Sequence, residues 1–103
     1  MTLEDLLKRA DELIQLGNQV LTTGKTTKYS AGEFVDTGLF AEFRVAALSF
    51  LLQMFGANSP YHKSFDADVK SLYSSEVKKA IGILKACRNE LAGGWVFTTR
   101  ALV

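Results

Sequence analysis

The segment from Leu39 to Phe55, LFAEFRVAALSFLLQMF, constrains the fold more than any other part of the chain. Its apolar residues surround the helical wheel, and the polar interruptions are Glu42, Arg44, Ser49 and Gln53. A helix that is apolar on all sides is either a membrane span or the centre of a bundle. This segment is short for a span and carries two charged residues. We therefore expect a central helix that is enclosed by its neighbours in a soluble protein, with no membrane contact.

Start signals and apolar stripes predict three further helices. Thr2 can cap a helix that runs to about Thr22, and the pair Ser59-Pro60 favours a start for a third helix. A fourth helix starts at Ser74 or Ser75, and its buried stripe is predicted to be Val77, Ala80, Ile81, Leu84, Cys87 and Leu91. The fold class is therefore all-α: a bundle of four to five helices around the central, nearly all-apolar one.

Two features modify this simple bundle. Gly17 lies on the apolar stripe of the first helix, where a glycine is tolerated if another helix approaches closely. Residues 23–36 are rich in Gly, Thr and Lys, so we expect a polar loop there, followed by Asp36 or Thr37 as the cap of the central helix. No strand pairing is expected, because Trp95 to Phe97 is the only β-like run.

Composition indicates one domain, residues 1–103, with a net charge of +1. Near-neutrality argues against a strong global attraction to nucleic acid or to an anionic membrane. The lone cysteine and the acidic N-terminus favour a cytoplasmic protein with no secretory signal. The end of the chain, WVFTTRALV, is unusually apolar. It either folds back onto the bundle or continues further, so the domain is interpreted as the possible N-terminal part of a longer protein.

Motifs for chemistry are weak. Gly24-Lys25-Thr26 lacks the earlier glycine, and it follows a helix instead of the strand that a phosphate-binding loop requires. His62 is the only histidine, and its i,i+4 neighbour Asp66 is expected to steady a helix. Cys87 lies on an apolar stripe, which favours a buried structural thiol. We expect no catalytic residue, no cofactor and no metal, and hence no enzyme.

Arg44 is the least expected side chain, because it lies within the most apolar helix. A buried guanidinium must pair, reach solvent along its stem or meet a partner. Candidate counter-ions are Glu33, Asp36 and Glu90. Two interpretations stay open: an internal ion pair that holds two helices together, or a contact with a functional partner.

Two function classes follow. The first is a non-catalytic protein-interaction or oligomerisation module, which binds itself or the rest of its own polypeptide through an apolar face anchored by Tyr61, Trp95, Phe97 and Leu102. The alternative is nucleic-acid binding by a basic strip on the fourth helix, formed by Lys78, Lys79, Lys85 and Arg88. A merely solvated face explains the same strip, and the near-neutral net charge favours the first class.

Several short runs of the chain form a recognisable set: Phe43-Arg44, Ala47-Leu48-Ser49-Phe50-Leu51, Phe55-Gly56, Ser59-Pro60-Tyr61, Gly82-Ile83-Leu84-Lys85-Ala86 and Gly93-Gly94-Trp95. Together they resemble the N-terminal helical regions of uncharacterised bacterial proteins, some of them associated with mobile elements or phage defence. The resemblance covers the whole chain and includes no catalytic motif. It implies an accessory or assembly domain whose chain continues into further helices, and it assigns no active-site residues.

Overall fold

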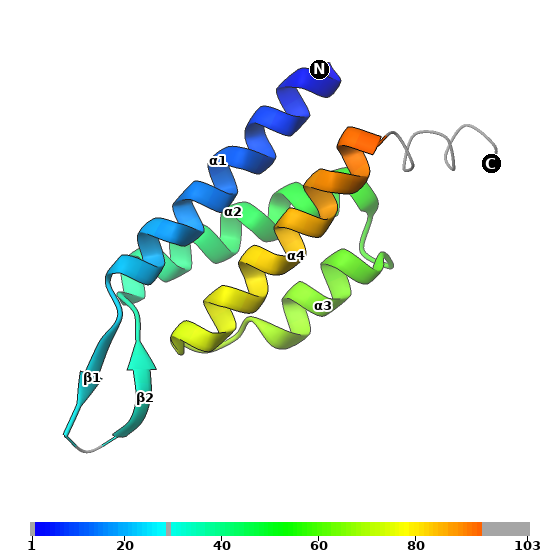
Figure 1. Cartoon of the computed structure of the whole chain (residues 1–103). Coiled ribbons are helices and arrows are strands. Elements are labelled where there is room, and N and C mark those ends of the chain that lie inside the picture. The colour runs from blue at the N-terminus through cyan, green and yellow to red at the C-terminus, as the bar shows by residue number, and fades with distance from the viewer. Residues whose placement is uncertain (1, 29, 94–103) are drawn as a thin grey trace.

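The computed structural model of this chain describes residues 2–28 and 30–93. In this part the chain forms α1 (Leu3–Thr22), β1 (Lys25–Thr27), β2 (Ser30–Phe34), α2 (Thr37–Phe55), α3 (Pro60–Asp68) and α4 (Ser74–Gly93) (Figure 1). The protein is mainly helical, as predicted. The prediction of a fifth helix at the C-terminus falls on residues 94–103, outside the described part of the chain.

Capping side chains account for where three helices begin. Thr2 and Asp5 form a reciprocal capping box at the start of α1. The Asp36 carboxylate accepts a hydrogen bond from the Leu39 amide and caps α2. The Ser59 hydroxyl accepts one from the His62 amide, with Pro60 in the first turn of α3. These starts agree with the sequence-based expectations.

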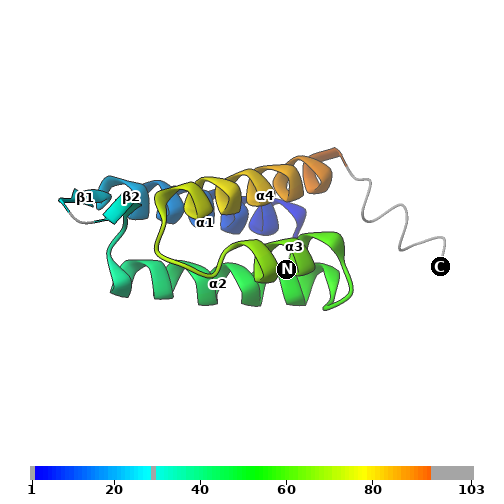
Figure 2. The same cartoon turned by 90° about the horizontal axis from the view of Figure 1, so that it is seen from below.

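The helices form two layers. Helices α1 and α4 lie side by side in one layer, and α2 and α3 form the other (Figure 2). The core between them includes Leu13 of α1, Phe43 of α2, Phe65 of α3 and Leu84 of α4, each fully buried. The whole predicted stripe of α4, from Val77 to Leu91, is buried.

Gly17 of α1 lies in close contact with both α4 and α2. A Cβ atom at this position would lie 2.8 Å from Cγ1 of Ile81 in α4 and 3.0 Å from the ring of Phe43 in α2. Any larger residue would therefore displace α4 or α2 from α1. The expected close approach of another helix at Gly17 is present, and it involves two helices at once.

The expectation that α2 is enclosed on all sides was wrong. Its inner face is buried through Phe40, Phe43, Ala47, Phe50 and Leu51. Its outer face is open: Val45 is 67% exposed and Leu52 is 47% exposed. In a two-layer arrangement every helix has an outer side, and α2 packs mainly against α1 and α3. An apolar wheel reports the composition of a helix and does not report how many neighbours surround it.

The expectation of a polar loop at 23–36 was also wrong, because β1 and β2 form an antiparallel hairpin. Lys25 pairs with Phe34 and Thr26 with Glu33, and the register shifts after Thr26. Gly32 has a φ of +112°, a backbone conformation that suits glycine at such an irregularity. β-Branched Thr26 and Thr27 favour a strand, and this preference prevails over the flanking Gly and Lys residues.

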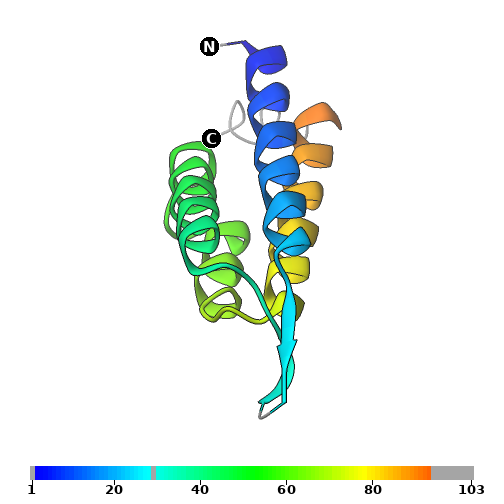
Figure 3. The ribbon, with the colours of Figure 1, turned by 90° about the vertical axis from the view of Figure 1, so that its left-hand side faces the viewer.

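The hairpin projects beyond the helices at one end of the molecule (Figure 3). It connects α1 in one layer to α2 in the other. The segment between α3 and α4 also crosses between the layers at this end, and it is bonded to β2 by an isolated bridge between Phe34 and Tyr73. Both chain crossings between the layers are therefore held together at the hairpin end.

Candidate functional surfaces

The outer face of α2 carries an apolar stripe, which we call the outer stripe. Its members, Ala41, Val45, Leu48 and Leu52, are spaced by four, three and four residues, the spacing of the a and d positions in a coiled coil. Leu48 is half-buried and the other three are exposed. The outer stripe is separated by more than a quarter turn from the core face of the same helix. Leu48 packs partly against the core, whereas Ala41, Val45 and Leu52 are left exposed, so α2 presents a second apolar face outside the core.

Arg44 lies beside the outer stripe and joins α2 to the end of α3. Its Nε donates to the carbonyl oxygen of Val69 at 2.6 Å, and its Nη2 lies 3.0 Å from Oδ1 of Asp66. The Arg44 side chain is only 26% exposed. A cation at a helix C-terminus also satisfies unpaired carbonyl groups. Within the described residues, Arg44 thus holds two helices together.

The three proposed counter-ions of Arg44 were wrong. A carboxylate oxygen of Glu33 accepts a hydrogen bond from the Ser74 hydroxyl at 2.7 Å, and Asp36 caps α2. Glu90 lies near Tyr61, where burial and the negative charge of Glu90 raise the pKa of the tyrosine hydroxyl. The true partner, Asp66, is also the residue that was expected to interact with His62. Sequence spacing on one helix suggested that local pair, but the guanidinium of α2 reaches Asp66 instead.

Tyr61, the first of the predicted interface anchors, is partly packed inside the domain and partly exposed to solvent. Its ring centroid lies 4.9 Å from that of Phe55, and the residue is half-buried. Burial, together with the negative charge of the nearby Glu90, raises the pKa of the Tyr61 hydroxyl above its ordinary value. Tyr61 therefore helps to hold α3 against its neighbours. The other three predicted anchors, Trp95, Phe97 and Leu102, lie outside the described residues.

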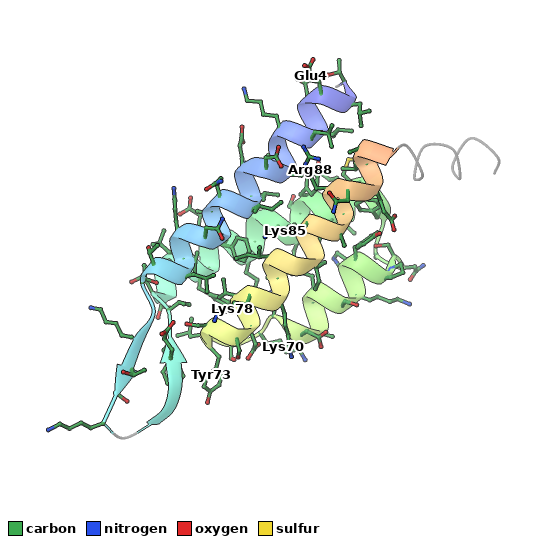
Figure 4. All side chains as sticks on the ribbon, viewed as in Figure 1. Glu4, Lys70, Tyr73, Lys78, Lys85 and Arg88 are labelled. Atoms are coloured by element: carbon green, nitrogen blue, oxygen red, sulfur yellow. The ribbon has the colours of Figure 1, made fainter. Side chains whose placement is uncertain are left out.

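The predicted basic strip of α4 is divided. Figure 4 shows Lys78, Lys85 and Arg88 along α4, but Nε of Arg88 lies 3.1 Å from Oδ1 of Asp11 and so binds α4 to α1. Lys79 instead lines a groove between α3 and α4, together with Tyr61 and Asp68. The four cations therefore do not act as one surface. The helical spacing placed them roughly on one side, but it gave no information about the acid on α1.

A different basic region lies at the hairpin end. Figure 4 shows Lys70, Tyr73 and Lys78 together where α4 begins. The ring centroid of Tyr73 lies 4.7 Å from that of Phe34, and Tyr73 remains 40% exposed. Sequence reasoning missed this group, because it depends on contact between a hairpin and a connecting segment about forty residues further along the chain.

The residues with reactive side chains offer little chemistry. Cys87 is fully buried, and burial, assisted by the charge of Glu90, raises the pKa of its thiol to about 12. The reactive thiolate is therefore disfavoured. Lys25 and Thr26 of the Gly-Lys-Thr tripeptide lie in a strand, and the side chain of Glu33 lies against Gly24. Among the described residues, no three His, Cys, Asp or Glu side chains are grouped to hold a metal ion.

Comparisons with known proteins do not add a function. A scan against protein-family models and searches of curated proteins and of solved structures found no match to this chain. The resemblance to bacterial N-terminal helical regions therefore stays a prediction. Of the described helices, α2 alone has the length and composition of a membrane span, a property shared by core helices of soluble proteins.

Proposed function

We propose that this chain is a non-catalytic helical oligomerisation module, in which the outer stripe of α2 binds the same stripe of a second copy. The observation that carries the proposal is the exposure of Val45 and Leu52, 67% and 47%, at coiled-coil spacing on an otherwise folded domain. Burying such side chains in an interface lowers the free energy by about 25 cal/mol per Å² of apolar surface removed from water.

The charges around the stripe favour a second copy in an antiparallel arrangement. Glu42 is an exposed charged residue of α2 beside the stripe and forms no ion pair within the described residues, whereas the charge of Arg44 is paired with Asp66 of α3. In a parallel pair the two Glu42 carboxylates would lie at the same level and repel each other. In an antiparallel pair centred on Leu48 they lie about 18 Å apart along the axis, beyond the screening distance of physiological salt.

A two-fold symmetric pair is also consistent with an isologous interface, because the same stripe, with the same residue spacing, lies on both copies. The net charge of +1 gives little repulsion between copies. The exposed area is modest and association carries an entropic cost, so we expect a dissociation constant between about 1 µM and 1 mM. The bacterial, cytoplasmic setting and the phage-defence resemblance belong to this proposal as predictions.

Sedimentation equilibrium of the full chain, over concentrations that span this range, tests the proposal. We expect dimer formation in the natural chain and its loss in the double variant Val45→Glu/Leu52→Glu. Leu3→Glu is the matched control, because Leu3 is 40% exposed but lies away from the stripe. Circular dichroism would verify that all three proteins keep their helices.

Two results would overturn self-association. One is a monomer at every concentration, with the same mass for the natural chain and the double variant. The other is equal dissociation by Leu3→Glu. A monomer that instead sediments with neutral phospholipid vesicles, and loses this property in the double variant, would identify a lipid surface as the occupant of the stripe.

A further inference from the structure

At the hairpin end, the exposed aromatic side chain of Tyr73 is held in place by residues of the hairpin. The Tyr73 ring lies against Phe34 and over Gly32, where an added Cβ would be 3.1 Å from the ring. Lys25 is the register partner of Phe34 on the other strand. Residues opposite each other in adjacent strands point to the same face, so Lys25, Phe34 and Tyr73 form one row across the hairpin. At the usual strand spacing, Lys25 and Tyr73 are about 10 Å apart along this row.

The segment that carries Tyr73 is fixed on both sides. The Val35 amide donates to the Leu72 carbonyl oxygen at 2.9 Å, and the Ser74 hydroxyl donates to Glu33. The Glu76 carboxylate accepts hydrogen bonds from the Lys70 amide at 2.8 Å and from the Ser71 amide at 2.9 Å. A ligand bound here would meet groups that are already ordered, which lowers the entropic cost of binding.

Three lysines on the segments next to Tyr73 are available to a ligand: one on β1, one before Tyr73 and one in the first turns of α4. Lys25, Lys70 and Lys78 are exposed, and none of them forms an ion pair with another residue of the described part. The nearby acids are already held by donors within the domain: Glu33 by Ser74, and Glu76 by the Lys70–Ser71 segment. Positive charge beside a partly exposed ring is complementary to a ligand in which anionic groups alternate with planar groups.

We propose that this surface, formed by Lys25, Lys70, Tyr73 and Lys78, binds single-stranded nucleic acid, with one base stacked on Tyr73 and phosphates contacted by the lysines. Single strands fit because their bases are free to stack on an aromatic ring, whereas a duplex buries its base faces. The surface is distinct from the outer stripe, so this inference does not depend on self-association. It also differs from the strip predicted from sequence, since Lys79, Lys85 and Arg88 are not part of it.

The experiment is fluorescence anisotropy with labelled oligouridine and oligothymidine of about 12 nucleotides, a length within the range of one binding site. Three phosphate contacts on a single strand predict a slope of about −2 for the logarithm of the binding constant against the logarithm of salt. Tyr73→Ala should weaken binding by about 5- to 100-fold, whereas Tyr73→Phe, which keeps the ring, should bind like the natural chain.

Charge variants complete the test. Lys70→Gln/Lys78→Gln should weaken binding and make the salt slope shallower by about 1.4. Lys85→Gln is the matched control, because it removes one lysine from the same helix further from the hairpin, and it should change little (Figure 4). The natural ligand class is single-stranded RNA if oligouridine binds more tightly, and single-stranded DNA if oligothymidine does.

Three outcomes would overturn the proposal. The first is no binding of the oligonucleotides at about 50 mM salt, where electrostatic contacts are strong. The second is an affinity for a duplex or for polyglutamate equal to that for the single strands, and the third is an equal affinity of the natural chain and Tyr73→Ala for the single strands. The second would identify a non-specific polyanion contact. The helical content of each variant, measured by circular dichroism, separates loss of binding from loss of folding.

Discussion

Helices α2 and α4 have similar lengths, but their sequences are informative in different ways. In α4 the apolar residues form one stripe, and each member of the stripe is buried. In α2 apolar residues surround the helix, yet only one face is in the core, while Val45 and Leu52 face solvent. An amphipathic sequence therefore specifies which side of a helix is covered. A uniformly apolar sequence leaves that choice to the packing of the other helices.

The largest expected effect on stability, which tests the contrast between covered and open faces, compares two positions within α2. Phe43→Ala should lower the free energy of unfolding by about 3–5 kcal/mol, because Phe43 is fully buried between the layers. Val45→Ala, two residues away on the outer stripe, should change it by less than about 0.5 kcal/mol in the monomer. Urea denaturation at low protein concentration measures both. Equal losses would mean that the outer face is covered in solution.

The next test concerns how α2 is attached to its layer. Arg44→Met keeps much of the apolar stem but removes the bonds to Asp66 and Val69, and should cost about 1–3 kcal/mol of unfolding free energy. Arg9→Met is the control, since the Arg9–Glu12 pair is about half exposed at both ends and should contribute less than about 0.5 kcal/mol. If both variants lose the same amount, Arg44 does not hold α2 to α3.

A glycine pair sharpens the contrast between covered and open helix faces. Gly82→Ala in α4 should raise the unfolding free energy by about 1 kcal/mol, because nothing lies within 4 Å of the added Cβ and alanine favours helix. Gly17→Ala in α1 should lower it by about 1 kcal/mol, since the clash with Ile81 and Phe43 exceeds the same helical gain. Thermal denaturation of both variants gives the signs, and a gain at Gly17 would contradict the close contact of α1 with α4 and α2.

The smallest expected effect is a pH dependence at the start of α4. Hydrogen bonds from Ser71, aided by the Lys70 and Ser71 amides, lower the pKa of Glu76 below its ordinary value of 4.5. A carboxylate with a lowered folded-state pKa stabilises above the unfolded-state pKa, and this contribution is lost as the pH falls through the folded-state value. Glu76→Gln should therefore be less stable than the natural chain at pH 7. The difference should disappear on acidification, and a difference that is constant with pH would exclude this origin.

Features that depend on neighbouring residues in the chain were predictable. The caps at Thr2, Asp36 and Ser59 and the stripe of α4 follow from patterns within a few residues. The hairpin was not foreseen, because the support for β2 comes partly from Tyr73 in the segment before α4. The partner of Arg44 was missed for the same reason: Asp66 is 22 residues away and reaches Arg44 only through the packing of α3.

The candidate surfaces were predictable to a smaller degree. Exposure of the outer stripe cannot be derived from an apolar helical wheel, since the wheel is the same whether or not a neighbour covers it. The basic residues of α4 were identified, but their division by Asp11 required the position of α1. The outcome for Trp95, Phe97 and Leu102 stays a prediction.

The location of both layer crossings at the hairpin end has a mechanical consequence. Among the described residues, no backbone connection crosses between the layers at the opposite end, where α1 starts and α2 finishes (Figure 3). A cleft of about 420 Å³ lies there between the two helices, with Leu6, Phe50 and Met54 among the residues that line it. Within the described residues, the layers are therefore joined at this end by side-chain packing and not by the chain itself.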